Sequence, residues 1–159
     1  MAKLKNILIG LTITTGLVGL GAWLFRLKKA SVEIEVLSRI SLHKVTLSGV
    51  TLRVDTKLQN PSSASPTLRF PFVRIYHSEN LIGSSEVKNT TITVPSNGEV
   101  TLEPIFIQSP MTSLLSFGAE FIQKLKAKSQ LTLVVKTTTQ LLLGKASIPF
   151  STTENIKLS

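Results

Sequence analysis

Hydrophobic and polar residues alternate along most of the chain that follows residue 30. The clearest stretch is residues 50–59, where Val, Leu, Val, Thr and Leu at the even positions alternate with polar residues at the odd positions. Successive side chains of a strand point to opposite faces, so this stretch predicts an antiparallel strand that buries one face. Weaker alternation of Val and Ile with Glu33 and Glu35 predicts an earlier strand within residues 30–47.

Turn-forming residues separate the later strands. An Asn-Pro pair at residues 60–61 opens a loop, residues 77–80 suit a hairpin turn, the Pro-Ser-Asn-Gly segment 95–98 is a strong turn signal, and Gly144 ends a strand. Gly83 indicates a bulge or a close approach of two backbones. The strands predicted between these turns are residues 68–76, 81–85, 90–94, 99–108, 129–143, 146–150 and 156–158.

The hydrophobic period changes after the strand predicted at residues 99–108. In that strand we expect Phe106 on the same face as Val100 and Leu102. Beyond it, Leu, Phe and Ile recur at helical spacing while Gln and Lys lie toward the other side, and Ser and Thr are available to cap the start. This pattern predicts one helix, Ser113–Lys126.

Several short strands separated by turns, with one helix, indicate a mainly β protein. The spacing of the turn signals is typical of an antiparallel β-sandwich. No internal repeat is apparent in the sequence, which argues against a solenoid.

The N-terminal part of the chain has a different pattern. Residues 7–25 form an uncharged apolar run of 19 residues with basic residues on both sides and Trp23 near one end. As a helix it would be about 28 Å long, close to the ~30 Å hydrocarbon core of a bilayer. We therefore predict a transmembrane anchor over residues 1–30 and a β-sandwich domain over residues 31–159.

A cleaved signal peptide is the alternative to the anchor. Signal peptides have a shorter apolar region that ends at a small-x-small cleavage site. The candidates here, Gly19-Leu20-Gly21 and Leu20-Gly21-Ala22, are poor versions of such a site and lie inside the apolar run. We expect an uncleaved single-pass protein with its N-terminus in the cytoplasm and its domain outside, although the flanking positive charges are nearly balanced.

The formal net charge of +9 is concentrated beside the apolar run. Without the five flanking basic residues, 13 basic and 9 acidic residues remain, a net charge of 13 − 9 = +4. Anionic lipid attracts such flanking charge, so we expect the lipid bilayer as a partner, and no nucleic acid. The chain has no cysteine, which excludes disulfides and thiolate metal sites. The flanking residues are Lys3, Lys5, Arg26, Lys28 and Lys29.

Groups suited to catalysis are few and scattered. The chain has two histidines, His43 in a predicted strand and His77 at a predicted turn, and one aspartate, Asp55. Neither histidine has another His or Cys at ligand spacing, so a metal site is not expected. We interpret both histidines as structural or solvated side chains.

Two charged clusters have ordinary explanations. Glu33 and Glu35 share one strand face and resemble a solvated edge, while Lys124, Lys126 and Lys128 fall at the end of the predicted helix. The lysines suit the negative end of the helix dipole, and contact with lipid headgroups is the alternative. The sequence has no Gly-rich phosphate loop and no Gly-x-Ser-x-Gly elbow. We predict that the protein is not an enzyme, with no catalytic, cofactor-binding or metal-binding residues.

The order of these motifs resembles the late embryogenesis abundant group-two family, which contains the water stress and hypersensitive response domain. The resemblance covers roughly residues 32–158 and departs from the family at residues 62–71. It implies an immunoglobulin- or fibronectin-like β-sandwich with one helix, no enzymatic activity and no cofactor. Many relatives are tethered to membranes, and their suggested roles include protection under stress and lipid binding. The matching segments are Asn60-Pro61, residues 72–76, residues 81–85, residues 92–98, the helix Ser113–Lys126, residues 131–139, Gly144, residues 148–151 and residues 156–158.

Three functions fit this sequence. The first is a membrane-anchored binding or stress-protective module. The second is a structural subunit of a membrane-associated assembly, such as an envelope complex or a lipid-containing virion, which would bring protein partners. The third is a lipid carrier whose sheets open to admit acyl chains.

Overall fold

The computed structural model describes residues 34–127 and 131–158. The predicted anchor at residues 7–25 lies outside these described residues, as do Glu33 and Lys128. Within the described ranges, no helix has the length and apolar character needed to cross a bilayer.

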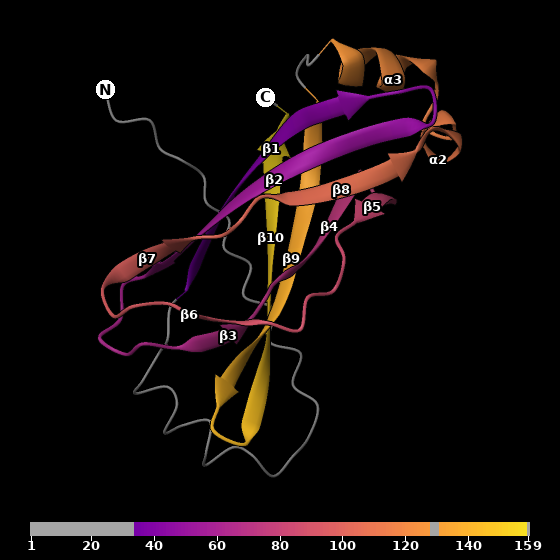
Figure 1. Ribbon diagram of the computed structural model, residues 1–159. Helices are drawn as coiled ribbons and strands as arrows, with labels where there is room; N and C mark the ends of the chain where they lie inside the picture. Colours follow the sequence, from indigo (N-terminus) through magenta and orange to yellow (C-terminus); the bar gives the residue numbers. More distant parts are fainter. Residues whose placement is uncertain (1–33, 128–130, 159) are drawn as a thin grey trace, which may run out of the picture.

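The described chain is mainly β, and every strand pairing in it is antiparallel, as the sequence predicted. The strands form two sheets (Figure 1). In the sheet we call sheet A, β2 is central, β1 pairs along one side, and β7 and β8 follow one another along the other side. Its strands are β1 (Glu35–Val45), β2 (Gly49–Asn60), β7 (Gly98–Thr101) and β8 (Ile105–Pro110).

Sheet B is organised around β9. On one side, β9 pairs with β4 and β3, which carry β5 and β6 in turn; on the other side it pairs with β10. Gly144, at φ +60°, turns β9 into β10, and the hairpin projects at the end of the molecule away from α3 (Figure 1). The strands are β3 (Thr67–Arg69), β4 (Phe72–His77), β5 (Asn80–Ser84), β6 (Thr91–Thr93), β9 (Thr132–Leu143) and β10 (Ala146–Lys157).

The core lies between the inward faces of the two sheets and is divided into two apolar clusters. The larger cluster joins residues such as Leu52 of β2 and Leu133 of β9 to Phe121 and Leu125. The smaller cluster lies toward the end where β1 begins. It contains Ile34, Leu58, Leu68, Val94 and Leu102.

The alternation predicted for residues 50–59 is confirmed. Even-numbered residues of β2 from Val50 to Asn60 are all buried, and odd-numbered ones from Gly49 to Gln59 are partly exposed. This regular pattern places one complete face of β2 in the core. The strand is central because it also has a paired strand on each side.

The strand predicted at residues 99–108 is two strands, so the prediction for Phe106 is wrong. Leu102 and Ile105 are three positions apart, which would place them on opposite faces of one continuous strand, yet both are buried, and Phe106 is 47% exposed. Pro104 lies between β7 and β8, and proline has no N–H to donate to a sheet. The interruption shifts the alternation by one residue, which turns Phe106 outward.

The single helix predicted at Ser113–Lys126 is also wrong, because the segment forms two short helices. These are α2 (Met111–Leu115) and α3 (Ala119–Lys126). Gly118 lies between them, just before α3, at φ +87° and ψ 164°, an extended conformation with positive φ that glycine adopts readily and that no helical residue has. Helical spacing of apolar residues continues across Gly118, which is why the sequence pattern does not reveal the break.

The expected close approach at Gly83 is confirmed. A Cβ atom there would lie 2.8 Å from Cγ2 of Ile107 and 3.3 Å from the carbonyl oxygen of Gln108, so β5 and β8 can meet only at glycine. The register of β4 and β5 also shifts between Ile75 and Tyr76, opposite this residue. The Pro95–Gly98 turn is confirmed by a 3.2 Å hydrogen bond from the Gly98 N–H to the Pro95 carbonyl.

Candidate binding surfaces

The two histidines lie on different sheets and each contacts aromatic rings. His43 is exposed on β1, with its ring centroid 4.8 Å from that of Phe106. His77, at the end of β4, lies 4.8 Å from Phe121 and 6.1 Å from Phe117, and its Nδ1 is buried without a hydrogen-bond partner. Neither imidazole is hydrogen-bonded to a carboxylate, so the described structure brings together no histidine–acid pair.

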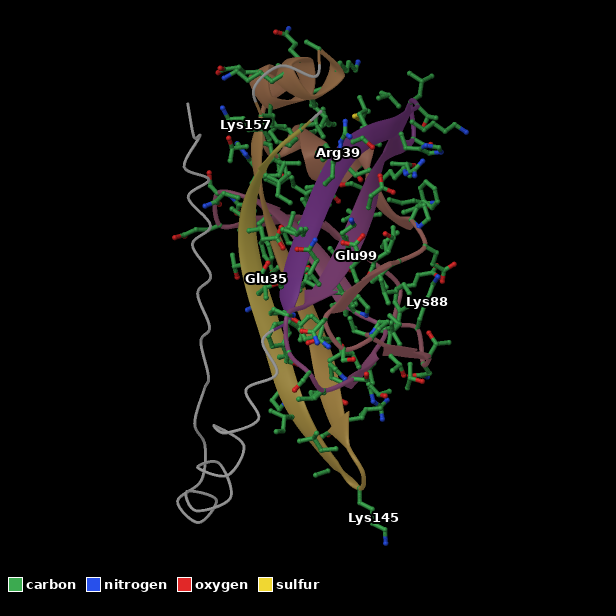
Figure 2. All side chains as sticks on the ribbon, turned by 90° about the vertical axis from the view of Figure 1, so that its left-hand side faces the viewer. Glu35, Arg39, Lys88, Glu99, Lys145 and Lys157 are labelled. Carbon is green, nitrogen blue, oxygen red and sulfur yellow. The ribbon has the colours of Figure 1, made fainter. Side chains whose placement is uncertain are left out.

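The outward face of sheet A carries carboxylates that are paired with cations. Asp55 lies 2.9 Å from Arg53, and Glu99 lies 2.7 Å from Lys57 (Figure 2 shows where Glu99 lies). Hydrogen bonds from Lys57 and Gln59 lower the pKa of Glu99 below its usual value. These charges satisfy one another on the surface, which leaves this face electrostatically mixed.

The predicted lysine cluster is largely a helix-end arrangement. Lys124 pairs with Glu120 at 2.6 Å, four residues apart on α3, and Lys126 lies in the last turn. Cations there interact favourably with the negative end of the helix dipole. In the described residues no group of three or more His, Asp or Glu side chains is placed to hold a metal ion.

An open hollow of about 600 Å³ lies where β1 begins. Glu35, Glu99, Asn60 and Pro61 are among the residues that line it. The Asn60 amide donates hydrogen bonds to the carbonyls of Ala64 and Pro95 at 2.6 and 2.9 Å and so joins three segments of the chain beside the hollow. The hollow has acidic and amide groups and suits a polar group of a partner, although both carboxylate oxygens of Glu99 already accept hydrogen bonds from Lys57 and Gln59.

A polar layer crosses the core between the two apolar clusters. Thr56 of β2 and the neighbouring pair Thr137 and Thr152 of sheet B have buried hydroxyls with no hydrogen-bond partner in the described structure. Beside them, Glu154 of β10 accepts the Ser38 backbone N–H of β1 at 3.1 Å. Glu154 therefore bridges the edge strands of the two sheets.

Burial dominates the electrostatics of Glu154. Desolvation raises the pKa of its carboxyl above the usual value, and the hydrogen bonds from Ser38 offset this only in part. A void beside this layer, lined by residues such as Val36 and Phe150, is too narrow to admit a water molecule. An acyl chain would enter here only if the two sheets separated.

Comparison with solved structures finds a protein of similar fold, whereas comparison with protein families and curated proteins finds no match. No protein-family model matches the chain, and no curated protein matches it. A crystal structure of a protein from Archaeoglobus fulgidus is 14% identical and has a TM-score of 0.51, covering 79% of this chain and 94% of its own. A solution structure of a protein from Arabidopsis thaliana is 16% identical with a TM-score of 0.48, covering 81% and 85%. At such identities the likeness to the Archaeoglobus protein concerns the fold alone.

Sequence reasoning missed the polar layer and Glu154. Thr56 occupies an even, inward position in an otherwise apolar alternation, which is a readable signal for a buried hydroxyl. Glu154 gives no such signal, because its contact with Ser38 depends on how two distant edge strands meet.

Proposed function

We propose that the chain is a single-pass membrane protein that presents a non-enzymatic binding or stress-protective module at a membrane surface. Its module is an immunoglobulin- or fibronectin-like β-sandwich of the late embryogenesis abundant group-two type, held outside the cytoplasm. The observation that carries this proposal is the uncharged run of residues 7–25 with basic flanks. Its length matches a bilayer-spanning helix.

The distribution of charge in the two-sheet structure supports a binding role. Carboxylates of sheet A such as Asp55 and Glu99 are engaged with cations, and the imidazoles of His43 and His77 lie apart. Catalysis needs groups placed together for proton transfer or nucleophilic attack. We therefore expect the function of this domain to depend on its binding surfaces.

Tethering to a membrane can compensate for the weak binding affinity of a surface. Eight residues, 26–33, connect the apolar run to the described structure, and fully extended they span at most about 29 Å. A module held that close to a bilayer has a high effective concentration toward anything on the bilayer. Weak contacts of strand faces and loops with lipid or protein then suffice.

Protease accessibility of a C-terminal tag in intact cells, with the molecular mass read from the same gel, tests the tether. We expect a full-length product that is digested once the outer barrier of the cell is opened. A product about 20–30 residues shorter would identify a cleaved signal peptide and refute the anchor. A full-length product that is protected until the anchored membrane itself is breached would place the module in the cytoplasm.

A protection assay tests the role of the module. A client enzyme is dried or frozen with the purified protein and, in parallel, with an equal mass of an unrelated protein. Preferential retention of client activity supports a protective role, and equal loss in both samples refutes it.

A structural subunit is the second candidate, because leucines are exposed at the α2 end of the body. Leu47, between β1 and β2, is 99% exposed, and Leu115 of α2 is 61% exposed. The Met111 N–H bonds the Ser48 carbonyl at 2.9 Å and so joins the two segments that carry them. Stable co-purification with protein partners in mild detergent, abolished by Leu47→Ser and Leu115→Ser together, would favour this role.

A further inference from the structure

The outward face of sheet B differs from that of sheet A in its charge. Strand register places Arg74 of β4 directly opposite Lys136 of β9, which lies opposite Thr153 of β10. Lys157 lies on the same face of β10, four residues beyond Thr153. Exposed Arg69 of β3 is on this face as well. The other residues of the face are hydroxyl or amide side chains, half-buried rings and a few aliphatic side chains, namely Phe72, Tyr76, Leu81, Ser84, Thr132, Val134, Thr138, Gln140, Leu142, Pro149, Ser151 and Asn155.

No carboxylate lies on this face in the described structure. Glu154, the acidic residue of β10, points inward to Ser38, and Glu79 and Glu86 lie in the β4–β5 turn and beyond the end of β5. Arg74, Lys136 and Lys157 form no ion pair within the described residues. The guanidinium of Arg74 lies over the ring of Phe72, 5.0 Å from its centroid, which holds it on the surface.

The Arg74–Lys136 pair is unfavourable without a counter-ion. Side chains directly opposite on neighbouring strands have Cβ atoms about 5 Å apart, and like charges in such pairs destabilise a sheet. An anionic group above the pair removes this repulsion and gains hydrogen bonds from both cations. The neighbouring hydroxyls of Ser84 and Thr153 add donors without adding negative charge.

We propose that the outward face of sheet B docks on a bilayer that contains anionic phospholipid, with Arg74, Lys136 and Lys157 meeting the phosphate groups. This inference rests on the proposed tether, which holds the body within reach of the bilayer. The β9–β10 hairpin is twelve residues long on each strand, about 40 Å, so it can lie along the membrane surface.

The composition of the face favours lipid over nucleic acid. Proteins that bind single strands stack bases on accessible aromatic rings. Phe72 and Tyr76 are half-buried, and Phe72 is already occupied by Arg74. A broad face of hydroxyl and partly exposed apolar side chains with separated cations suits an array of phosphate headgroups. Each Lys or Arg contributes about a fivefold gain in binding near an anionic surface.

The test uses the full-length chain in vesicles and a single fluorophore on cysteine. The natural sequence has no cysteine, so Gln140→Cys labels the sheet B face alone and Thr101→Cys labels the outward face of sheet A. Vesicles carry a headgroup quencher in either phosphatidylcholine or phosphatidylcholine with phosphatidylglycerol. We expect stronger quenching of the Gln140→Cys label in the anionic vesicles, lost at high salt, and little change for the Thr101→Cys label.

Charge variants make the test specific. Lys136→Gln should lower the docked-to-undocked ratio about fivefold, and Arg74→Gln with Lys136→Gln about 25-fold. Lys44→Gln is the matched control, because Lys44 is an exposed strand lysine of sheet A without an ion pair in the described structure. It removes the same charge and should leave the ratio unchanged.

The outcomes separate docking from the tether. A chain that leaves the vesicles in alkaline carbonate refutes the tether, and the docking that depends on it. A retained chain whose Gln140→Cys label is quenched equally in both vesicles refutes docking alone, as does preferential quenching of the Thr101→Cys label. The proposal is also overturned if the fluorescence of the Gln140→Cys label changes on addition of a short single-stranded oligonucleotide but is not affected by anionic lipid. That result would assign the face to nucleic acid.

Discussion

The buried hydroxyl of Thr137 should make the protein less stable than it would be with valine in its place. Thr137 lies on β9 between the sheets, is 1% exposed, and has no hydrogen-bond partner for its Oγ1 in the described structure. Valine has nearly the same shape and prefers strands. Thr137→Val therefore removes an unpaired polar group and leaves the packing in place.

The magnitude follows from the cost of desolvation. Burying a hydroxyl without a hydrogen bond costs about 1–3 kcal/mol by protein mutational data. We expect Thr137→Val to raise the free energy of unfolding by about 1–2 kcal/mol. Thr139→Val is the matched control on the same strand and face, since the Thr139 hydroxyl donates to the Arg69 carbonyl. Loss of this hydrogen bond in Thr139→Val should lower the free energy of unfolding by about 1 kcal/mol.

Urea-induced unfolding, followed by circular dichroism of the β structure, measures both variants against the parent chain. Opposite signs for Thr137→Val and Thr139→Val support the reasoning. A loss of 1 kcal/mol or more in Thr137→Val would refute it, because such a loss shows that the Thr137 hydroxyl is bonded in solution.

Three further predictions follow from the core, the charges and the backbone. Leu133→Ala, at a fully buried position, should lower the free energy of unfolding by about 2–5 kcal/mol in urea titrations, whereas Leu47→Ala, 99% exposed, should change it by less than about 0.5. The raised pKa of Glu154 means that the folded state binds the proton more tightly than the unfolded state. Stability should therefore fall as the pH rises above the usual glutamate value toward the raised one, and urea midpoints measured against pH should lose this component in Glu154→Gln. Gly118→Ala should lower the thermal midpoint, at a cost of about 1–3 kcal/mol, because φ +87° with ψ 164° is a conformation essentially restricted to glycine, although the space around it is open.

The turns were the most predictable part of the structure. Pro95–Gly98 and Gly144 form turns as expected, because the dihedral preferences of Pro, Asn and Gly act within a few residues. At Gly83 the sequence indicated a bulge or a close approach, and the structure shows a close approach of β8 with a register shift beside it. A residue without Cβ marks a place where another backbone can come near.

Two of the errors arose where one residue interrupts a pattern that continues around it; in a third, the strands predicted at residues 146–150 and 156–158 are the single strand β10. Pro104 shifts the alternation so that Phe106 points outward, and Gly118 divides the apolar helix-like stretch into α2 and α3. Both residues were visible in the sequence. Their effect was not visible, because the spacing of apolar residues fits the strand or helix period on both sides of the interruption. Such spacing does not show that the strand changes which residues face inward, or that the helix stops and starts again.

The sequence by itself determined the class of structure: antiparallel strands, the inward face of strands with regular alternation such as β2, and most of the turns. These features follow from interactions between residues close together in the chain. The tertiary structure alone decided which polar groups meet. Arg74 and Lys136 become neighbours through the register of β4 and β9, and Glu154 reaches Ser38 across two sheet edges. Such contacts depend on strand order and on how two sheets pack, and no local pattern carries that information.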